Sequence, residues 1–226
     1  MKKSILTLVL LSTLFSLYSQ VKVSVLGDSY STYEGWIPEG NEPWYGEKIG
    51  NDVKDVKDTW WHQLIEDNGL QLELNNSWSG ATICNTGYNG ADYTHRSFLT
   101  RSGSLGDNPD LIFVFGGTND AWAGSPLGES DGTDMFTVRP AAKEMFKNIK
   151  ANYPEALCVA IINTELSPEV EDAIIKACEI EEVPYVKLES IDKQFGHPSV
   201  HGMKQISHQV WKTTAPFLYQ HLKSSK

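Results

Sequence analysis

Short apolar runs alternate with segments of helical periodicity along most of the chain. The runs predict strands at residues 21–26, 70–75, 110–115, 157–163 and 185–188, and the periodicity predicts helices at residues 59–67, 141–153, 168–180 and 200–223. The run at 110–115 is apolar without alternation and lies between Pro109 and Gly116, as expected of a central strand with both faces buried. Strands that alternate with helices predict an α/β domain on a parallel sheet.

Two stretches interrupt this alternation. Residues 33–58 are rich in Gly, Pro, Trp and charged residues, and residues 121–137 are rich in Gly, Asp and Ser. Both follow the ends of predicted strands, where open α/β sheets bind their ligands. We therefore interpret both as candidate walls of a substrate site, with simple surface loops as the alternative.

The first 19 residues differ from the rest. Lys2 and Lys3 precede an almost wholly apolar run at 5–17, and Ser19 offers a small residue before Gln20. This pattern predicts a signal peptide at 1–19, a domain at 20–226, and export to the periplasm or the medium. The alternative, a membrane anchor, would need a longer apolar run. We expect no stable membrane insertion of the chain that follows.

The composition and charge of the chain limit the classes of partner that it can bind. The chain is 40% hydrophobic and 21% charged, which excludes global disorder, and its net charge of −10 gives no overall attraction to nucleic acid or anionic membranes. The spacing of the three cysteines, Cys84, Cys158 and Cys178, predicts neither a metal site nor a disulfide. Whether any of them pair, and whether the chain forms oligomers, stays open.

Four points at or just beyond strand ends carry groups useful for acyl transfer. Ser29, in Gly-Asp-Ser after the first strand, can act as a nucleophile, and Gly80 can bring a backbone N–H close to a carbonyl. The amide of Asn119, in Gly-Thr-Asn-Asp, can donate to an oxyanion, and His197 can act as a base near neutral pH. Taken alone, Gly-Asp-Ser is equally well explained as a turn or a helix cap, Gly80 is only a loop glycine, and Asn119 is better explained as a turn residue.

Together, the motifs GDS, NxSxxG, GTND and HPxxxG, in this order, resemble the four blocks of the SGNH (GDSL-type) hydrolases, in a secreted bacterial branch. The resemblance implies a three-layer α/β/α sandwich on a five-stranded parallel sheet of flavodoxin-like order. It implies Ser29 as nucleophile, His197 as base, and an oxyanion hole of the Ser29 and Gly80 N–H groups with the Asn119 side chain. It implies no metal and no organic cofactor.

The chain departs from the family at one position. The family usually has Asp three residues before the histidine, where this chain has Gln194, with Asp192 two residues earlier. Gln194, Asp192 or a backbone carbonyl could orient the ring, the last leaving a Ser–His dyad. His201, one helical turn along, is a rival base that the HPxxxG pattern does not select.

The substrate is predicted from weaker signals. Export, acidity and loop aromatics favour a short acyl ester, such as an acetyl ester, on a carbohydrate. The candidate substrate-binding residues are Asp28, Trp36, Trp44 and Trp122, with Tyr45 beside them. The alternatives are a lysophospholipase or thioesterase acting on lipid acyl groups, and a catalytically silent carbohydrate-binding module on the same scaffold. The expected partner is a small-molecule or polysaccharide ester.

Overall fold

A computed structural model describes residues 20–224, so the predicted signal peptide lies outside the described residues. A five-stranded sheet has the order β2-β1-β3-β4-β5, and every neighbouring pair in it is parallel. Its strands are β1 (Lys22–Gly27), β2 (Gln71–Ser77), β3 (Leu111–Phe115), β4 (Leu157–Ile162) and β5 (Tyr185–Lys187). The predicted fold class and all five predicted strands are confirmed, with ends shifted by at most two residues.

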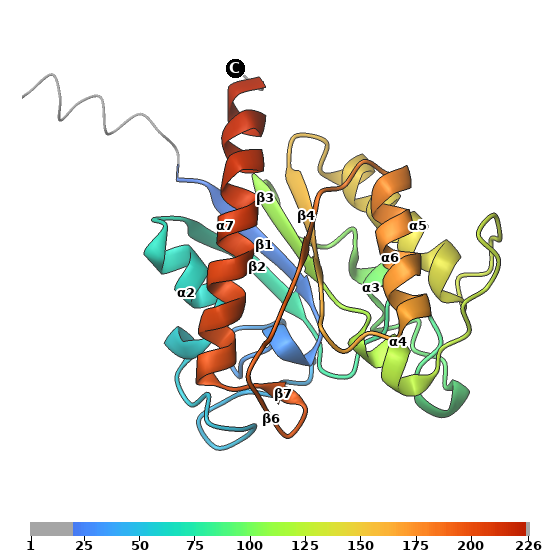
Figure 1. Cartoon of the computed structure of the whole chain (residues 1–226), viewed down its shortest axis with the longest axis horizontal. Helices are drawn as coiled ribbons and strands as arrows, with labels where there is room; N and C mark the ends of the chain where they lie inside the picture. The colour runs from blue at the N-terminus through green and yellow to red at the C-terminus, as the bar shows by residue number, and fades with distance from the viewer. Residues whose placement is uncertain (1–19, 225–226) are drawn as a thin grey trace, which may run out of the picture.

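Helices cover both faces of the sheet and make it the middle of three layers (Figure 1). One face packs against α2 (Trp60–Asp67) and α7 (Val200–Ser224), and the other packs against α5 (Val138–Asn152) and α6 (Pro168–Ile180). Along β3, Phe113 and Phe115 join the first of these cores, whereas Ile112 and Val114 join the second. The strand is apolar at every position because both of its faces are buried.

Several short elements had no counterpart in the predicted pattern. They are the 3₁₀ turns η2 (Ser29–Ser31), η3 (Val56–Asp58) and η4 (Tyr88–Gly90), the helices α3 (Phe98–Arg101) and α4 (Thr118–Ala123), and an antiparallel pair of β6 (Lys193–Gln194) and β7 (His197–Pro198). The β6–β7 pair and α4 lie at the same end of the sheet, the lower end in Figure 1.

The three cysteines, Cys84, Cys158 and Cys178, are buried and free, and none forms a disulfide. Within residues 20–224, no helix combines the length and the apolar character that a membrane crossing requires. Over the same residues, no group of three or more His, Cys, Asp or Glu side chains is arranged to hold a metal ion.

Candidate active site

Ser29 lies two residues beyond β1, in the turn η2. Asp28 is the N-cap of this turn, and its Oδ1 accepts a hydrogen bond of 3.0 Å from the Tyr30 N–H. A Cβ on Gly27 would collide with the side chains of Ser31 and Ser77, so only glycine fits where the strand enters the turn. The Gly-Asp-Ser sequence therefore fixes the direction in which Ser29 leaves the sheet.

His197 lies on β7, just before α7, and meets Ser29 across the end of the sheet. Its Nε2 is 3.0 Å from Ser29 Oγ, and both residues are buried. Burial lowers the pKa of His197 below its ordinary value of 6.5, with a smaller effect of Lys193 in the same direction, while the Phe195 carbonyl and Glu165 act against them. The ring is thus neutral near pH 7 and can accept the Ser29 proton.

A backbone carbonyl orients the imidazole. The Nδ1 atom of His197 lies 3.1 Å from the carbonyl oxygen of Phe195, so Nδ1 carries the proton and Nε2 offers its lone pair to Ser29. Phe195 and Gly196 both adopt left-handed backbone conformations, with φ of 53° and 76°. The Gly196 carbonyl accepts a hydrogen bond of 2.6 Å from the Tyr30 hydroxyl, which ties this bend to the residue after the nucleophile.

The side chains expected to orient His197 are engaged elsewhere. Gln194 donates from Nε2 to Asp52 Oδ2 at 3.2 Å, and Asp192 accepts a hydrogen bond from the Ser199 hydroxyl. The structure therefore gives the orienting position to a carbonyl, the third possibility that the sequence left open. Gln194 pairs with His197 across the β6–β7 hairpin, but its side chain is exposed and bonded to Asp52, so the carbonyl of Phe195, at the left-handed tip of the hairpin, is the group that bonds the ring. The rival base, His201, is exposed on α7.

Three hydrogen-bond donors remain available near the Ser29 turn. Asn119 is buried in the first turn of α4, where its Nδ2 donates to the Ala81 carbonyl at 3.0 Å and its Oδ1 accepts from the Tyr88 hydroxyl at 2.9 Å. These bonds fix the amide and leave its second N–H unused. Within the described chain, no hydrogen bond uses the backbone N–H of Ser29 or of Gly80. Gly80 has φ of 76°, a conformation that glycine tolerates without strain.

A model of the GDSL-like lipase/acylhydrolase family matches residues 21–214, most of the chain. The chain belongs to this family. Among solved structures, a protein of Bacteroides uniformis assigned as a GDSL-like lipase is 48% identical, with a TM-score of 0.85 over 89% of this chain and 98% of the other. A counterpart from Bacteroides ovatus is 44% identical, with a TM-score of 0.84 over 88% of this chain and 100% of the other.

More distant solved structures share the fold. The carbohydrate acetylesterase Est24 of Sinorhizobium meliloti is 14% identical, with a TM-score of 0.62 over 88% of this chain and 100% of the other. No curated protein matches the chain. The resemblance to SGNH hydrolases is thus confirmed, and membership of this family makes the protein a hydrolase.

In this GDSL-like hydrolase a buried arginine, Arg101, holds the ends of two strands together, and no sequence motif predicted it. The Arg101 guanidinium donates to the carbonyls of Gly27, Asn76 and Arg96. Burial lowers the pKa of Arg101 to about 9, and the nearby Asp28 opposes this shift. Burial also raises the pKa of Asp28 to about 7. Asp28, 1% exposed, thus caps the Ser29 turn from inside the protein.

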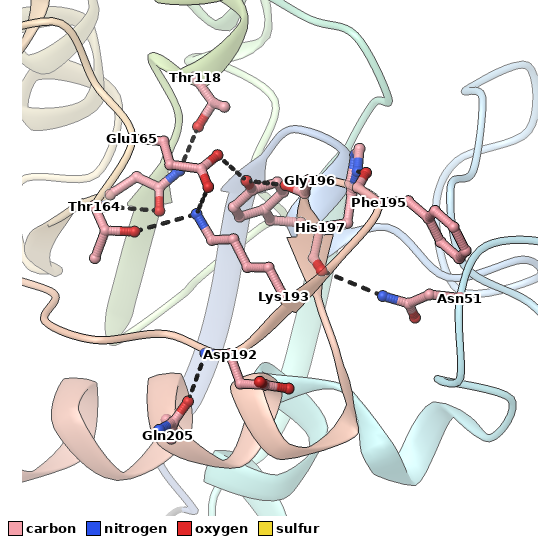
Figure 2. A network of polar contacts seen from close by, with 12 residues as sticks. Asn51, Thr118, Thr164, Glu165, Asp192, Lys193, Phe195, Gly196, His197 and Gln205 are labelled. Carbon is pink, nitrogen blue, oxygen red and sulfur yellow. Dashed lines mark hydrogen bonds and ion pairs between the residues drawn. The ribbon is translucent and has the colours of Figure 1, made fainter.

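The loop 33–58 clasps the histidine segment. The Tyr45 hydroxyl donates to the Pro198 carbonyl at 2.9 Å, and Asn51 Nδ2 donates to the carbonyls of Pro198 and His197 at 2.7 and 3.3 Å. Asp52 accepts the Val200 N–H at 3.0 Å. Figure 2 shows Asn51 reaching the carbonyl of His197 from outside the sheet. Much of this predicted substrate wall thus supports the histidine, a role that depends on tertiary contacts and had no signal in the sequence.

The loop aromatics expected to bind substrate occupy different places. Trp36 packs against Trp61 and the α2 residue His62, with ring centroids 5.9 and 5.8 Å away, and so sits against α2 instead of the histidine. Trp44 stacks on His197, and Trp122, 43% exposed, meets the same ring edge-on at 5.9 Å. Sequence reasoning missed a further aromatic at this rim, Phe195, which is 84% exposed.

Proposed function

We propose that this protein is a serine esterase that hydrolyses short acyl esters, acetyl esters foremost, on carbohydrates. The observation that carries the proposal is the 3.0 Å contact between Ser29 Oγ and His197 Nε2, in a site with unused N–H donors. A neutral imidazole at this distance from a buried hydroxyl is the arrangement that activates serine for attack on a carbonyl.

The reaction proceeds in two halves. Ser29 Oγ attacks the ester carbonyl while His197 Nε2 takes its proton, and the oxyanion forms against the N–H groups of Ser29 and Gly80 and the amide of Asn119. Collapse breaks the bond to the alcohol, which leaves with the proton from His197. Water then gives its proton to His197 and attacks the acyl-serine. Collapse breaks the bond to Ser29 Oγ, which takes the proton from His197 as the carboxylic acid leaves.

The preference for a sugar ester rests on the rim of the site. Trp122 has an exposed ring that contacts the ring of His197, and Phe195, two residues before His197, is also exposed. Aromatic faces of this kind pack well against the apolar faces of sugar rings. The net charge of −10 disfavours an anionic lipid surface. The acetylesterase among the structural neighbours shows that this fold can carry such a site.

Three measurements test the proposal. Incubation with a panel of acetylated polysaccharides should release acetate. Rates on p-nitrophenyl esters should fall as the acyl group of the ester lengthens. A rate that rises with acyl length would favour the lipid acyl hydrolase instead. A serine-directed phosphonate should add its mass to Ser29, and a chain that neither reacts with the phosphonate nor releases acetate would be a silent binding module.

We also propose that the protein is exported, because residues 1–19 combine a basic start with an apolar run. Mass spectrometry of the N-terminal peptide, after fractionation of expressing cells, should find a chain that begins at Gln20 outside the cytoplasm. An intact Met1 on a cytoplasmic chain would contradict export.

A further inference from the structure

The imidazole of His197 is surrounded by aromatic rings. Trp44 lies face to face with it, with ring centroids 3.8 Å apart and the planes inclined by only 12°. Tyr30, Tyr45 and Trp122 approach at 5.2, 6.4 and 5.9 Å with steep interplanar angles. The stacked indole is therefore the closest ring by more than an ångström, and one of its faces is taken up by the imidazole.

The proposed reaction requires His197 to carry a positive charge in a buried place. The Phe195 carbonyl that holds Nδ1 is neutral, so it fixes the tautomer but stabilises the cation less than a carboxylate would. The carboxylate of Glu165 is committed to an ion pair of 2.9 Å with Lys193, whose own charge acts against a second cation. Figure 2 shows this pair beside the loop that carries Gly196 and His197.

We propose that Trp44 is a positioning residue whose indole face holds the His197 ring and stabilises its protonated form, in place of the carboxylate that the family usually supplies. This inference rests on the proposed function. A cation over the face of tryptophan is attracted by the ring's quadrupole, and the attraction is largest where water is excluded. A stack at 3.8 Å places the imidazolium in that position at the moment when it forms.

Trp44 is held from both sides. Its backbone N–H donates to Thr32 Oγ1 at 2.8 Å, and the Thr32 hydroxyl donates to the Ser29 carbonyl at 3.0 Å. On the other side, Gly50 lies so close that a Cβ there would be 2.6 Å from the Trp44 carbonyl oxygen. The backbone of the stacking residue is thus fastened to the turn that carries the nucleophile.

The indole N–H adds a second observation. Trp44 Nε1 is buried and has no hydrogen-bond partner among the described residues. A buried donor without an acceptor costs free energy, and tryptophan usually satisfies it. At Trp44 the side chain is therefore placed for its ring face and not for its polar atom, as expected if the stack on His197 is its role.

The test compares Trp44→Phe with Trp44→Leu. Phenylalanine keeps an aromatic face. Leucine has nearly the volume of phenylalanine but no aromatic face. We expect Trp44→Leu to lower kcat/KM about threefold to thirtyfold and the pKa of His197 by about half a pH unit to one and a half. Because neutral His197 is the base, the acid limb of the kcat/KM profile should move to lower pH by the same amount. Trp44→Phe should stay near the wild type in both.

The pKa of His197 is also measured directly, by NMR titration of its imidazole nitrogens without substrate. The other titratable or charged groups around the ring are unchanged in every variant: Asp28, Tyr30, Tyr45, Asp52, Glu165 and Lys193. Equal changes in Trp44→Phe and Trp44→Leu, or an unchanged pKa in both, would overturn the proposal. If Trp44→Leu fails to fold by circular dichroism, Trp44→Met replaces it. If the pKa of His197 shifts as expected but the protein hydrolyses no ester, the esterase proposal is wrong and the role of Trp44 at the imidazole still holds.

Discussion

Ser29, Gly80 and Asn119 each follow the end of a parallel strand by at most four residues, whereas His197 lies on a two-residue strand outside the main sheet. The serine half of the site inherits its geometry from the register of β1, β2 and β3. The histidine half is assembled from two left-handed residues and a clasping loop that is distant in the sequence. A motif that follows a strand positions its side chain through nearby residues in the sequence. The position of the base instead depends on contacts between residues that are far apart in the sequence.

The two halves also differ in what holds them. The Ser29 turn is braced by the buried guanidinium of Arg101 and by side-chain packing that excludes any residue but glycine at position 27. The His197 segment is held by hydrogen bonds from Tyr30, Tyr45 and Asn51 to its carbonyls. Single bonds of this kind contribute about 1 kcal/mol each. We therefore expect single substitutions among the contacts that hold His197 to lower activity by small factors. Substitutions in the part of the site that carries Ser29 should lower activity by larger factors.

The largest effect should come from the point where the halves meet. Ser29→Ala and His197→Ala should each lower kcat about 10³-fold or more, because each removes one member of a single proton-transfer unit. For the same reason the double variant should be no slower than the worse single variant. Steady-state rates on p-nitrophenyl acetate measure all three. Losses that multiply in the double variant would mean that the two residues act separately.

Within the serine half, Asn119→Ala should lower kcat about 10²-fold to 10³-fold and leave KM nearly unchanged, because the amide acts on the oxyanion and not on the bound ester. Tyr88→Phe is its graded partner, since it removes only the O–H that fixes the Asn119 carbonyl oxygen at 2.9 Å. That variant should lose less than about tenfold. A rise in KM alone in Asn119→Ala would place the amide in substrate binding instead.

The sequence predicted the sheet, the main helices and the serine half, because apolar periodicity and strand-end motifs are local. It left open which group orients His197, because a carbonyl is present at every residue and carries no mark in the sequence. The bend at Phe195 and Gly196 decides that question, and only Gly196 hinted at it. Asn51, in a loop of mixed composition, could not be recognised as a support for a histidine 146 residues away.

The clasp offers a matched pair within one loop. Tyr45 donates to the Pro198 carbonyl at 2.9 Å, and Tyr33 donates to the Lys54 carbonyl at 2.6 Å, away from the histidine. Each change to Phe should cost about 1 kcal/mol of unfolding free energy and lower Tm by about 2 to 4 °C. Only Tyr45→Phe should also lower kcat/KM, about twofold to tenfold. Thermal unfolding and rates on one ester, measured for both variants, test this difference. Equal rate losses in the two variants would mean that the contacts of the loop with the histidine segment contribute only to stability.

The smallest effect should come from Gln194→Asp, which restores the residue that the family usually has at this position. Gln194 is exposed and bound to Asp52, and Nδ1 of His197 already has the Phe195 carbonyl as its partner. A carboxylate at 194 would face Asp52 as a like charge in solvent, an effect of at most about 1 kcal/mol. We expect kcat/KM within about twofold of the wild type and an unmoved acid limb. A tenfold gain in rate, with the acid limb shifted to higher pH, would mean that a carboxylate at 194 reaches the imidazole, and the histidine half would then follow the family's local pattern after all.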